Sequence, residues 1–593
     1  MIINHLVLTA LSIALASAQL QSPFKANKLP FKKVYHSNDP KDRLIKRDDY
    51  ESLDLRHIGV LYTAEIQIGS DETEIEVIVD TGSADLWVID SDAAVCELSY
   101  DEIEANSFSS ASAKFMDKIA PPSQELLDGL SEFGFALDGE ISQYLADKSG
   151  RVSKREENQQ DFNINRDEPV CEQFGSFDSS SSDTFQSNNS AFGIAYLDGT
   201  TANGTWVRDT VRIGDFAISQ QSFALVNITD NYMGILGLGP ATQQTTNSNP
   251  IAANRFTYDG VVDSLRSQGF INSASFSVYL SPDEDNEHDE FSDGEILFGA
   301  IDRAKIDGPF RLFPYVNPYK PVYPDQYTSY VTVSTIAVSS SDETLIIERR
   351  PRLALIDTGA TFSYLPTYPL IRLAFSIHGG FEYVSQLGLF VIRTSSLSVA
   401  RNKVIEFKFG EDVVIQSPVS DHLLDVSGLF TDGQQYSALT VRESLDGLSI
   451  LGDTFIKSAY LFFDNENSQL GIGQINVTDD EDIEVVGDFT IERDPAYSST
   501  WSSDLPHETP TRALSTASGG GLGTGINTAT SRASSRSTSG STSRTSSTSG
   551  SASGTSSGAS SATQNDETST DLGAPAASLS ATPCLFAILL LML

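Results

Sequence analysis

Cysteine, basic side chains and long apolar runs are all scarce in this chain of 593 residues. There are three cysteines, too few to indicate a cellular compartment by their number alone. Lysine and arginine total 39 against 80 aspartates and glutamates, and the resulting net charge of −41 excludes nucleic acid as a natural partner. The apolar runs at 6–16 and 585–593 are too short to cross a bilayer as helices, which takes about 20 residues.

The chain does contain one motif twice, Asp-Thr-Gly at the end of a short apolar run. The copies are Asp80-Thr81-Gly82 and Asp357-Thr358-Gly359. Each preceding run has the length and β-branching of a strand. Each copy is also followed by a later apolar-apolar-Gly run, at 234–239 and 449–453. An aspartate that closes a buried strand is costly unless it is hydrogen-bonded or functional, so the repeat indicates either a shared site or two capping groups.

A shared site has a clear chemistry. Two carboxylates about 3 Å apart cannot both ionise, so the pair holds one proton between them. The ionised partner then takes a proton from a water molecule, and the protonated partner donates to the carbonyl oxygen that the water attacks. Such a site needs no metal and no cofactor.

This arrangement resembles the pepsin-like aspartic endopeptidases, in which two related lobes each contribute one aspartate. The resemblance implies a mainly β, bilobal fold with the active-site cleft between two related β lobes, at 48–308 and 309–477. It implies Asp80 and Asp357 as the catalytic pair and a monomeric catalytic unit that acts on proteins and peptides. The residues expected to support the pair are Thr81, Gly82, Ser83, Thr358 and Gly359.

Several other segments match the family. The alternating stretch 61–69 is typical of the strand that precedes the first aspartate. Residues 195–214 look like the flap, a hairpin that closes over the substrate and supplies Tyr196. We expect Trp87, Tyr196 and Asp198 at the flap and specificity site, where Asp198 would pair with a basic substrate side chain. The alternatives are an ordinary strand aromatic for Tyr196 and an exposed turn residue for Asp198.

Two helices are also expected. Residues 260–265 with Gly269 predict a helix, a stop and then a strand. Residues 367–379 predict a helix with Thr367 as its N-cap and Gly379 past its end.

A long polar insertion occupies 97–170 and is bracketed by Cys96 and Cys171, the obvious disulfide in a secreted chain. Such a bond would hold the insertion as a closed appendage even if Lys154-Arg155 were cut. The fungal yapsin branch of the family resembles this chain, with an inserted, bracketed and often processed loop at the same place. Arg155 is the candidate processing residue of this loop.

The ends of the chain predict secretion and anchoring. Residues 1–18 read as a signal peptide that ends in Ala16-Ser17-Ala18. Residues 19–47 are rich in basic side chains and predict a pro-segment that is cut after Arg47. Within it, residues 29–33 would lie across the cleft. The alternative is a disordered leader. Residues 478–573 predict an acidic and then Ser/Thr-rich stalk. Residues 574–593 predict a GPI-attachment signal, or else an uncleaved apolar tail. The predicted N-glycosylation sites are Asn188, Asn203, Asn227 and Asn476.

Together these features predict an aspartic endopeptidase on the outer face of a fungal-type plasma membrane and cell wall, with a GPI anchor as its membrane attachment. By resemblance to yapsins, it should cleave secreted or cell-surface proteins and precursors beside Lys or Arg. The alternatives are a broad-specificity acid protease and a non-catalytic surface-anchored binding or structural protein.

The two motif copies are not equivalent. Ser83 follows the first Gly and has a hydroxyl that can donate to Asp80, whereas Ala360 takes the same place in the second copy. Asp357 thus lacks one donor to its charged form, which raises the apparent pKa of the pair. We therefore expect activity to extend to milder acid than in relatives with a hydroxyl at this place.

Overall fold

The computed structural model describes residues 27–30, 32–35, 60–99, 122–145, 168–196, 200–248, 254–280, 294–318, 320, 327–398, 400–444, 447–478, 480–487 and 489–495. Several sequence predictions fall outside these ranges: the signal peptide, Arg47, Arg155, Asp198, the Ser/Thr-rich tract and the GPI-attachment signal. Within the described ranges no helix has the length and apolar character needed to cross a membrane.

The first half of the chain builds an eight-stranded sheet, ordered β2-β3-β4-β10-β5-β9-β8-β7. Its strands are β2 (Lys32–Tyr35), β3 (Val60–Ile68), β4 (Thr73–Asp80), β5 (Leu86–Ile89), β7 (Gln186–Ala195), β8 (Thr201–Ile213), β9 (Phe216–Thr229) and β10 (Gly234–Gly237). The predicted strand at 61–69 is present as β3, and β4 ends at Asp80 as expected.

The second half builds three smaller sheets. The first contains β15 (Tyr330–Val333), β18 (Arg352–Ile356), β27 (Ser449–Leu451), β19 (Ser363–Leu365) and β26 (Val441–Glu443). The second contains β17 (Thr344–Glu348), β16 (Thr335–Ser339), β22 (Val404–Phe409) and β23 (Val413–Pro418). The third contains β24 (Leu423–Asp425), β25 (Tyr436–Leu439), β21 (Leu389–Arg393), β20 (Glu382–Val384) and β6 (Ala136–Leu137).

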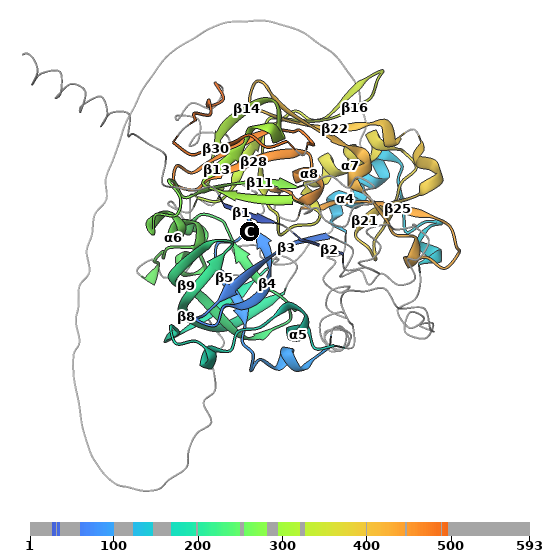
Figure 1. The fold of residues 1–593 in the computed structure, drawn as a ribbon. Helices are drawn as coiled ribbons and strands as arrows, with labels where there is room; N and C mark the ends of the chain where they lie inside the picture. Colours follow the sequence, from blue (N-terminus) through green and yellow to red (C-terminus); the bar gives the residue numbers. More distant parts are fainter. Residues whose placement is uncertain are drawn as a thin grey trace, which may run out of the picture. The chain divides into compact units, whose positions relative to one another are not determined.

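A six-stranded sheet joins the halves (Figure 1), in the order β1-β12-β11-β28-β29-β14. Its strands are β1 (Asn27–Pro30), β11 (Ser275–Leu280), β12 (Gly294–Phe298), β14 (Ile306–Pro314), β28 (Ala459–Asp464) and β29 (Gln469–Ile475). The central pair, β11 and β28, comes from opposite halves and runs antiparallel. The predicted lobe boundary at 308/309 therefore falls inside β14.

The two halves repeat one local topology. In the first, β10 runs parallel to β4, the strand of Asp80, and antiparallel to β5. In the second, β27 runs parallel to β18, the strand before Asp357, and antiparallel to β19. The apolar-apolar-Gly runs are thus the neighbours of the two aspartate strands. This duplication, with a mainly β content, confirms the predicted bilobal pepsin-like fold.

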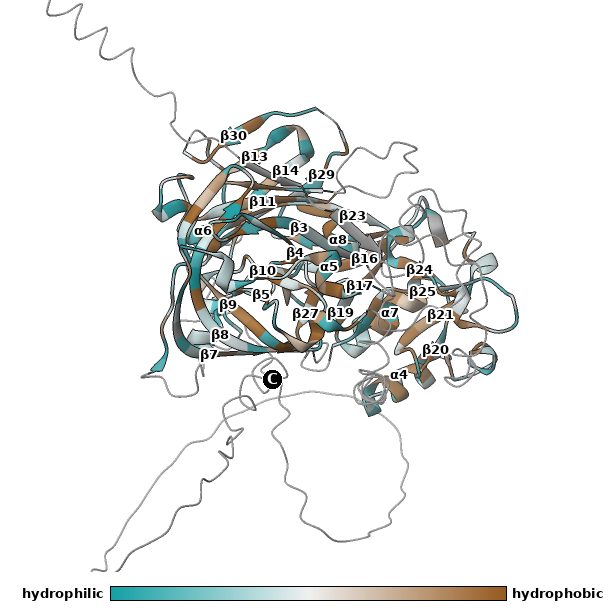
Figure 2. Ribbon diagram, turned by 60° about the horizontal axis from the view of Figure 1, so that its bottom comes forward, coloured by the Kyte–Doolittle hydropathy of each residue, from teal (hydrophilic) through white to brown (hydrophobic). Residues whose placement is uncertain are grey.

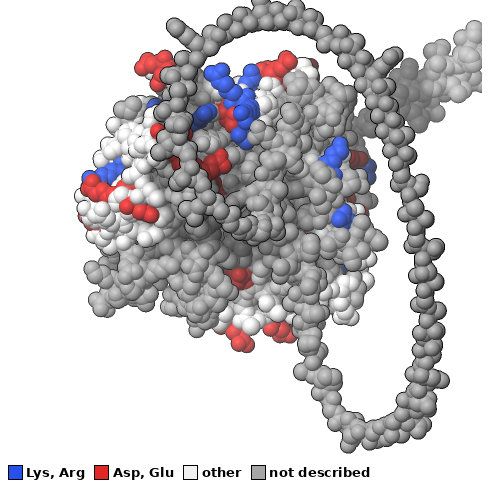
Figure 3. All heavy atoms as spheres, turned by 180° about the vertical axis from the view of Figure 1, so that it is seen from behind, with Lys and Arg blue, Asp and Glu red and all other residues white. Residues whose placement is uncertain are grey.

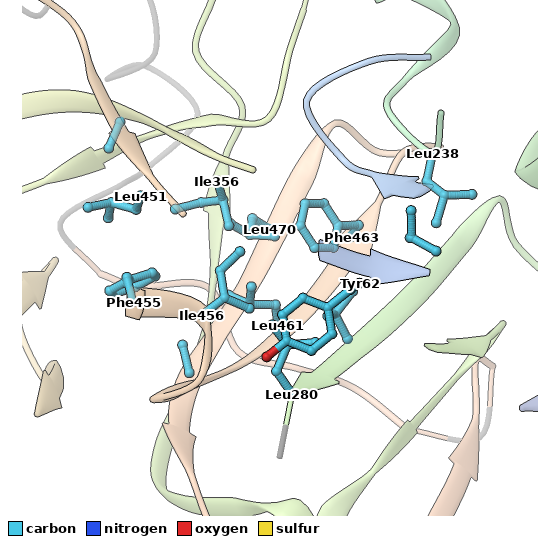
Figure 4. Packing of buried hydrophobic residues seen from close by; sticks show 14 of the residues in the cluster. Tyr62, Leu238, Leu280, Ile356, Leu451, Phe455, Ile456, Leu461, Phe463 and Leu470 are labelled. Carbon is cyan, nitrogen blue, oxygen red and sulfur yellow. The ribbon is translucent and has the colours of Figure 1, made fainter. Parts of the chain in front are cut away.

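One hydrophobic cluster runs through both halves beneath the aspartate loops (Figure 4). Tyr62 and Leu238 come from the first half, while Ile356, Leu451 and Phe463 come from the second. All five side chains are buried. Because burial of apolar area is the main favourable term in folding, this continuous core ties the loops of both halves to one packed base.

The described helices are α4 (Gln124–Phe133), α5 (Val170–Phe174), α6 (Val261–Ser267), α7 (Thr367–Ile377) and α8 (Asp453–Ile456). Helix α6 is followed by Gly269 at a φ of 82° and then by β11, as predicted. The predicted N-cap of α7 was wrong, because Pro366 caps the helix and Thr367 is its first residue. The Thr367 hydroxyl instead donates to Glu443 at 2.6 Å.

The insertion differs from the expected appendage. Cys96 and Cys171 form the anticipated disulfide at its base. Residues 122–145, however, carry α4, β6 and a 3₁₀ turn at Ser142–Tyr144, and they pack on the second half. The predicted appendage, held closed by the disulfide, is in this part a docked segment with its own helix and strand.

The predicted start of the stalk at 478 also needs correction. Strand β30 (Ile483–Val485) pairs with β13 (Ala300–Asp302), and Ile491 lies in a buried cluster with Phe310 and Phe462. The carboxylate of Asp494 accepts the backbone N–H of Glu411 at 2.9 Å. Residues 480–495 therefore belong to the folded body wherever the structure describes them.

Candidate active site

Asp80 and Asp357 lie against each other's loops. A Cβ atom added at Gly82 would lie 2.5 Å from Cγ of Asp357, and one added at Gly359 would lie 2.7 Å from Oδ1 of Asp80. The two carboxyl groups are joined by a side-chain hydrogen bond. Glycine is required at both places because any side chain would occupy the position of the opposite carboxyl group.

The hydrogen bonds at the two aspartates differ as the sequence predicts. Asp80 accepts the N–H of Gly82 at 2.7 Å and the hydroxyl of Ser83 at 2.5 Å. Asp357 accepts the N–H of Gly359 at 2.9 Å. Ala360 supplies no hydroxyl and instead uses its N–H to bond the Asp357 carbonyl at 3.3 Å. The first carboxylate therefore has a donor to its charged form that the second lacks.

Burial raises the pKa of the Asp357 carboxyl well above its ordinary value, and the nearby Asp80 carboxylate and the hydrogen bond to it raise that pKa further. The N–H groups of Gly359 and Gly82 oppose the shift. Loss of solvent and a like charge both disfavour an ionised carboxyl. Protonation of the Asp357 carboxyl is therefore favoured over that of a free carboxyl group at the same pH.

Two threonines lock the loops together beneath the carboxyl groups. The N–H of Thr81 donates to Thr358 Oγ1 at 3.1 Å, and the N–H of Thr358 donates to Thr81 Oγ1 at 3.0 Å. Each hydroxyl then donates onward, Thr81 to the Ile356 carbonyl at 3.0 Å and Thr358 to the Val79 carbonyl at 2.9 Å. Each hydroxyl thus accepts one hydrogen bond and donates one across the boundary between the halves.

Tyr196 directly follows β7, and its N–H donates to the carbonyl of Thr200 at 2.9 Å. The indole N–H of the fully buried Trp87 donates to the Tyr196 hydroxyl at 2.7 Å. The structure therefore brings together the two aromatic residues that the sequence assigned to the flap site.

The sequence did not single out several residues that support the first loop. Asp85 is buried and accepts the Tyr258 hydroxyl at 2.6 Å and the N–H of Thr245 at 2.9 Å. The Tyr258 ring packs on Trp206 of β8 with centroids 5.0 Å apart. Ser329 donates to the Thr81 carbonyl at 3.2 Å. These contacts join segments that are distant in the sequence, so no local sequence pattern predicts them.

The predicted glycosylation sites lie on different elements. Asn227 is exposed on β9, whereas Asn203 on β8 is partly buried. Asn476 is exposed and its side-chain N–H donates to the Ala304 carbonyl at 2.7 Å. Asn188 lies on β7.

Comparison with known proteins identifies the family. The profile described as eukaryotic aspartyl protease matches residues 61–475. Aspartic proteinase 3 of Saccharomyces cerevisiae is 31% identical, with 80% of this chain and 82% of the relative aligned. Aspartic proteinase MKC7 of the same yeast is 30% identical over 80% of this chain and 78% of the relative. Secreted aspartic protease 9 of Candida albicans is 29% identical over 76% and 83%. With its duplicated aspartate loops and yapsin-like relatives, the chain belongs to the eukaryotic, pepsin-like aspartyl proteases and is a hydrolase of peptide bonds.

Proposed function

We propose that Asp80 and Asp357 are the catalytic pair of a surface-anchored endopeptidase that cleaves secreted or cell-surface proteins and precursors beside Lys or Arg. The observation that carries the catalytic assignment is the crossed placement of the carboxyl groups, each against the glycine of the opposite loop. Such contact forces the two groups to share a proton at working pH.

In the proposed mechanism Asp80 is the ionised partner, because it accepts the N–H of Gly82 and the hydroxyl of Ser83. Asp357 holds the proton. A water molecule attacks the peptide carbonyl carbon, loses a proton to Asp80, and the carbonyl oxygen takes the proton of Asp357. The tetrahedral intermediate then collapses as Asp80 passes its proton to the leaving amine and one hydroxyl returns its proton to Asp357.

Tyr196 is proposed to close over the bound substrate. Its hydroxyl accepts the buried indole N–H of Trp87, which fixes the Tyr196 side chain against the first half. Asp198, two residues further on, is proposed to bind a basic substrate side chain. The support for a basic preference is the resemblance to yapsins and the acidic composition. Acidic side chains stand at several separate places on the face in Figure 3.

We also propose a zymogen released by cleavage after Arg47. The support is the backbone pairing of two strands inside the basic segment, β1 with β12 and β2 with β3. These strands lie at the edges of two sheets, so removal of the segment would expose both edges. Addition of a 19–47 peptide to the mature enzyme at neutral pH should inhibit it, and no inhibition would argue for a simple leader.

The catalytic assignment is tested by Asp80→Asn and Asp357→Asn. Each variant should fold and lose at least about 10³-fold in kcat/KM on peptide substrates. Asp183→Asn, which changes an exposed carboxylate on the same half, is the matched control and should retain full activity. Hydrolysis that persists in either active-site variant would exclude the shared-proton mechanism.

Specificity and anchoring need separate measurements. Cleavage-site profiling of the purified ectodomain on a peptide library should place Lys or Arg beside the cut bond; cuts without basic residues would favour the broad-specificity acid protease. A wild-type protein that binds peptides but never cleaves them would favour the non-catalytic alternative. Release of the protein from cells by a phospholipase specific for GPI would support the anchor.

A further inference from the structure

Residues 122–145 are the described part of the insertion, whose base on the first half is closed by the Cys96–Cys171 disulfide. Both cysteines pack on the hydrophobic cluster that contains Trp87, with Tyr196 at its margin. The base of the insertion therefore lies next to the proposed flap site.

Helix α4 of the segment packs on α7 of the second half, and Figures 1 and 2 both show the two helices side by side. The contact is close, because a Cβ atom at Gly129 would overlap Cδ1 of Ile371. Leu126 and Leu130 on the same face of α4 are buried in the main core cluster. A helix of ten residues is marginal alone, so this packing is what stabilises it.

The carboxylate of Glu443 accepts hydrogen bonds from residues at the starts of both α4 and α7. Ser123, the N-cap of α4, accepts the N–H of Leu126 and donates its hydroxyl to Glu443 Oε1 at 2.6 Å. Thr367 at the start of α7 donates to the same oxygen at 2.6 Å. Glu443 thereby aligns the two helix starts with each other.

Beyond α4 the segment adds to a sheet of the second half. Strand β6 pairs in parallel with β20. The buried carboxylate of Glu382 on β20 accepts the N–H groups of Ile141 at 3.0 Å and Ser142 at 2.9 Å. Asp138 accepts the N–H and the hydroxyl of Ser385 at 2.8 and 2.6 Å. Charged acceptors give stronger hydrogen bonds than neutral ones, so this docking is specific as well as apolar.

The far end of the segment reaches the second aspartate loop. Ile141 is buried in a cluster that contains Phe362, five residues after Asp357. The guanidinium of Arg442, beside Glu443, lies 4.5 Å over the Phe362 ring. Residues 122–145 thus dock on the second half from helix α7 to the cluster of Phe362.

We propose that residues 122–145 are a strap on the second half, a positioning element that holds the strands and the Phe362 cluster around the second aspartate loop and thereby places the Asp357 carboxyl group. This rests on the proposed function of Asp80 and Asp357. Cleavage after Arg155 would leave the strap in place, because the cut follows the docked residues and the disulfide still closes the base.

The first test is a compensation experiment. Gly129→Ala puts a methyl group where Ile371 Cδ1 lies, and Ile371→Val removes that atom. Gly129→Ala should speed hydrogen exchange in 124–133 and lower kcat/KM between about threefold and a hundredfold, since small misplacements at a site are costly. The double variant should restore both, and Ile371→Val alone should behave like the wild type. Faster exchange with unchanged kcat/KM would overturn the positioning role.

A second variant covers the case in which Ile371 adapts to the added methyl. Residues 122–145 are replaced by a Gly/Ser linker of equal length with both cysteines kept. Loss of kcat with native circular dichroism supports the strap, whereas wild-type rates exclude it. If the wild-type enzyme itself hydrolyses nothing, the proposed function fails, yet exchange protection of 124–133 still reports whether the segment docks. Exchange at free-peptide rates in the wild type would exclude docking.

Discussion

Thr81 and Thr358 each donate a backbone N–H to the other's hydroxyl oxygen, at 3.1 and 3.0 Å, across the boundary between the halves. Both residues are buried, so neither N–H has water as a substitute. The shape of the site beneath the two carboxyl groups depends on this exchange.

The first prediction follows from that bond pair. Thr358→Val keeps the shape but leaves the buried N–H of Thr81 without an acceptor, which should cost about 1–3 kcal/mol of folding free energy. It should also lower kcat/KM, because the loops lose their alignment. Thr358→Ser keeps the oxygen and should stay near the wild type. Urea denaturation and steady-state kinetics measure both effects, and equal values for Val and Ser would contradict the argument.

The second prediction concerns stability and pH. The folded state raises the pKa of Asp357 above its unfolded value of 3.8, so folding binds a proton and stability falls as pH rises through the raised pKa. Asp357→Asn removes this loss. The variant should melt above the wild type at pH 7, with a difference that shrinks toward pH 3. The exposed control Asp183→Asn should show no such trend, and a difference constant with pH would refute the linkage.

A third prediction uses the unequal donors. Ala360→Thr supplies a hydroxyl to the charged form of Asp357, the protonated partner, and should move the basic limb of the kcat/KM profile to lower pH. Ser83→Ala removes the 2.5 Å donor from Asp80, the ionised partner, and should move the acidic limb to higher pH. Shifts of about one pH unit are expected for one lost or gained bond to a charge. Movement in the same direction for both variants would rule out the explanation.

A fourth prediction tests the support of the first loop. Tyr258→Phe keeps the ring against Trp206 but removes the donor to the buried Asp85 carboxyl, whose pKa burial already raises. We expect a loss of about 1–3 kcal/mol in folding free energy at neutral pH. Protonation of Asp85 lowers the need for that donor, so the loss should be smaller in acid. Thermal melts of both proteins from pH 3 to 7 check this, and a loss that grows in acid would contradict it.

The aspartate pair could be predicted from the sequence because Asp-Thr-Gly after an apolar strand is a local pattern that occurs twice. The neighbouring strands β10 and β27 were also visible as apolar-apolar-Gly runs. The exchange between Thr81 and Thr358 was not predicted, because it depends on how two loops 277 residues apart meet. The partners of Asp85 were missed for the same reason.

The docked part of the insertion was missed although it carries a local signal. Ser123 and Gly134 stand at the start and end of α4 as cap residues usually do. A helix of this length gains its stability from the surface that it covers, and that surface, α7, is specified far along the chain. The folded structure of 480–495 was missed because strand β30 gains its partner, β13, only through tertiary packing.

The pairing of β11 with β28 has a consequence for synthesis of the protein. Ser277 on β11 accepts the hydroxyl of Tyr460 on β28 at 2.8 Å, and these residues are 183 positions apart. At a translation rate of about 5–20 residues per second, β11 waits roughly 10–40 seconds on the ribosome for its neighbour. Throughout that interval β11 has one open edge, because β12 pairs only with its other side, so chaperones have a defined edge to protect before the chain is complete.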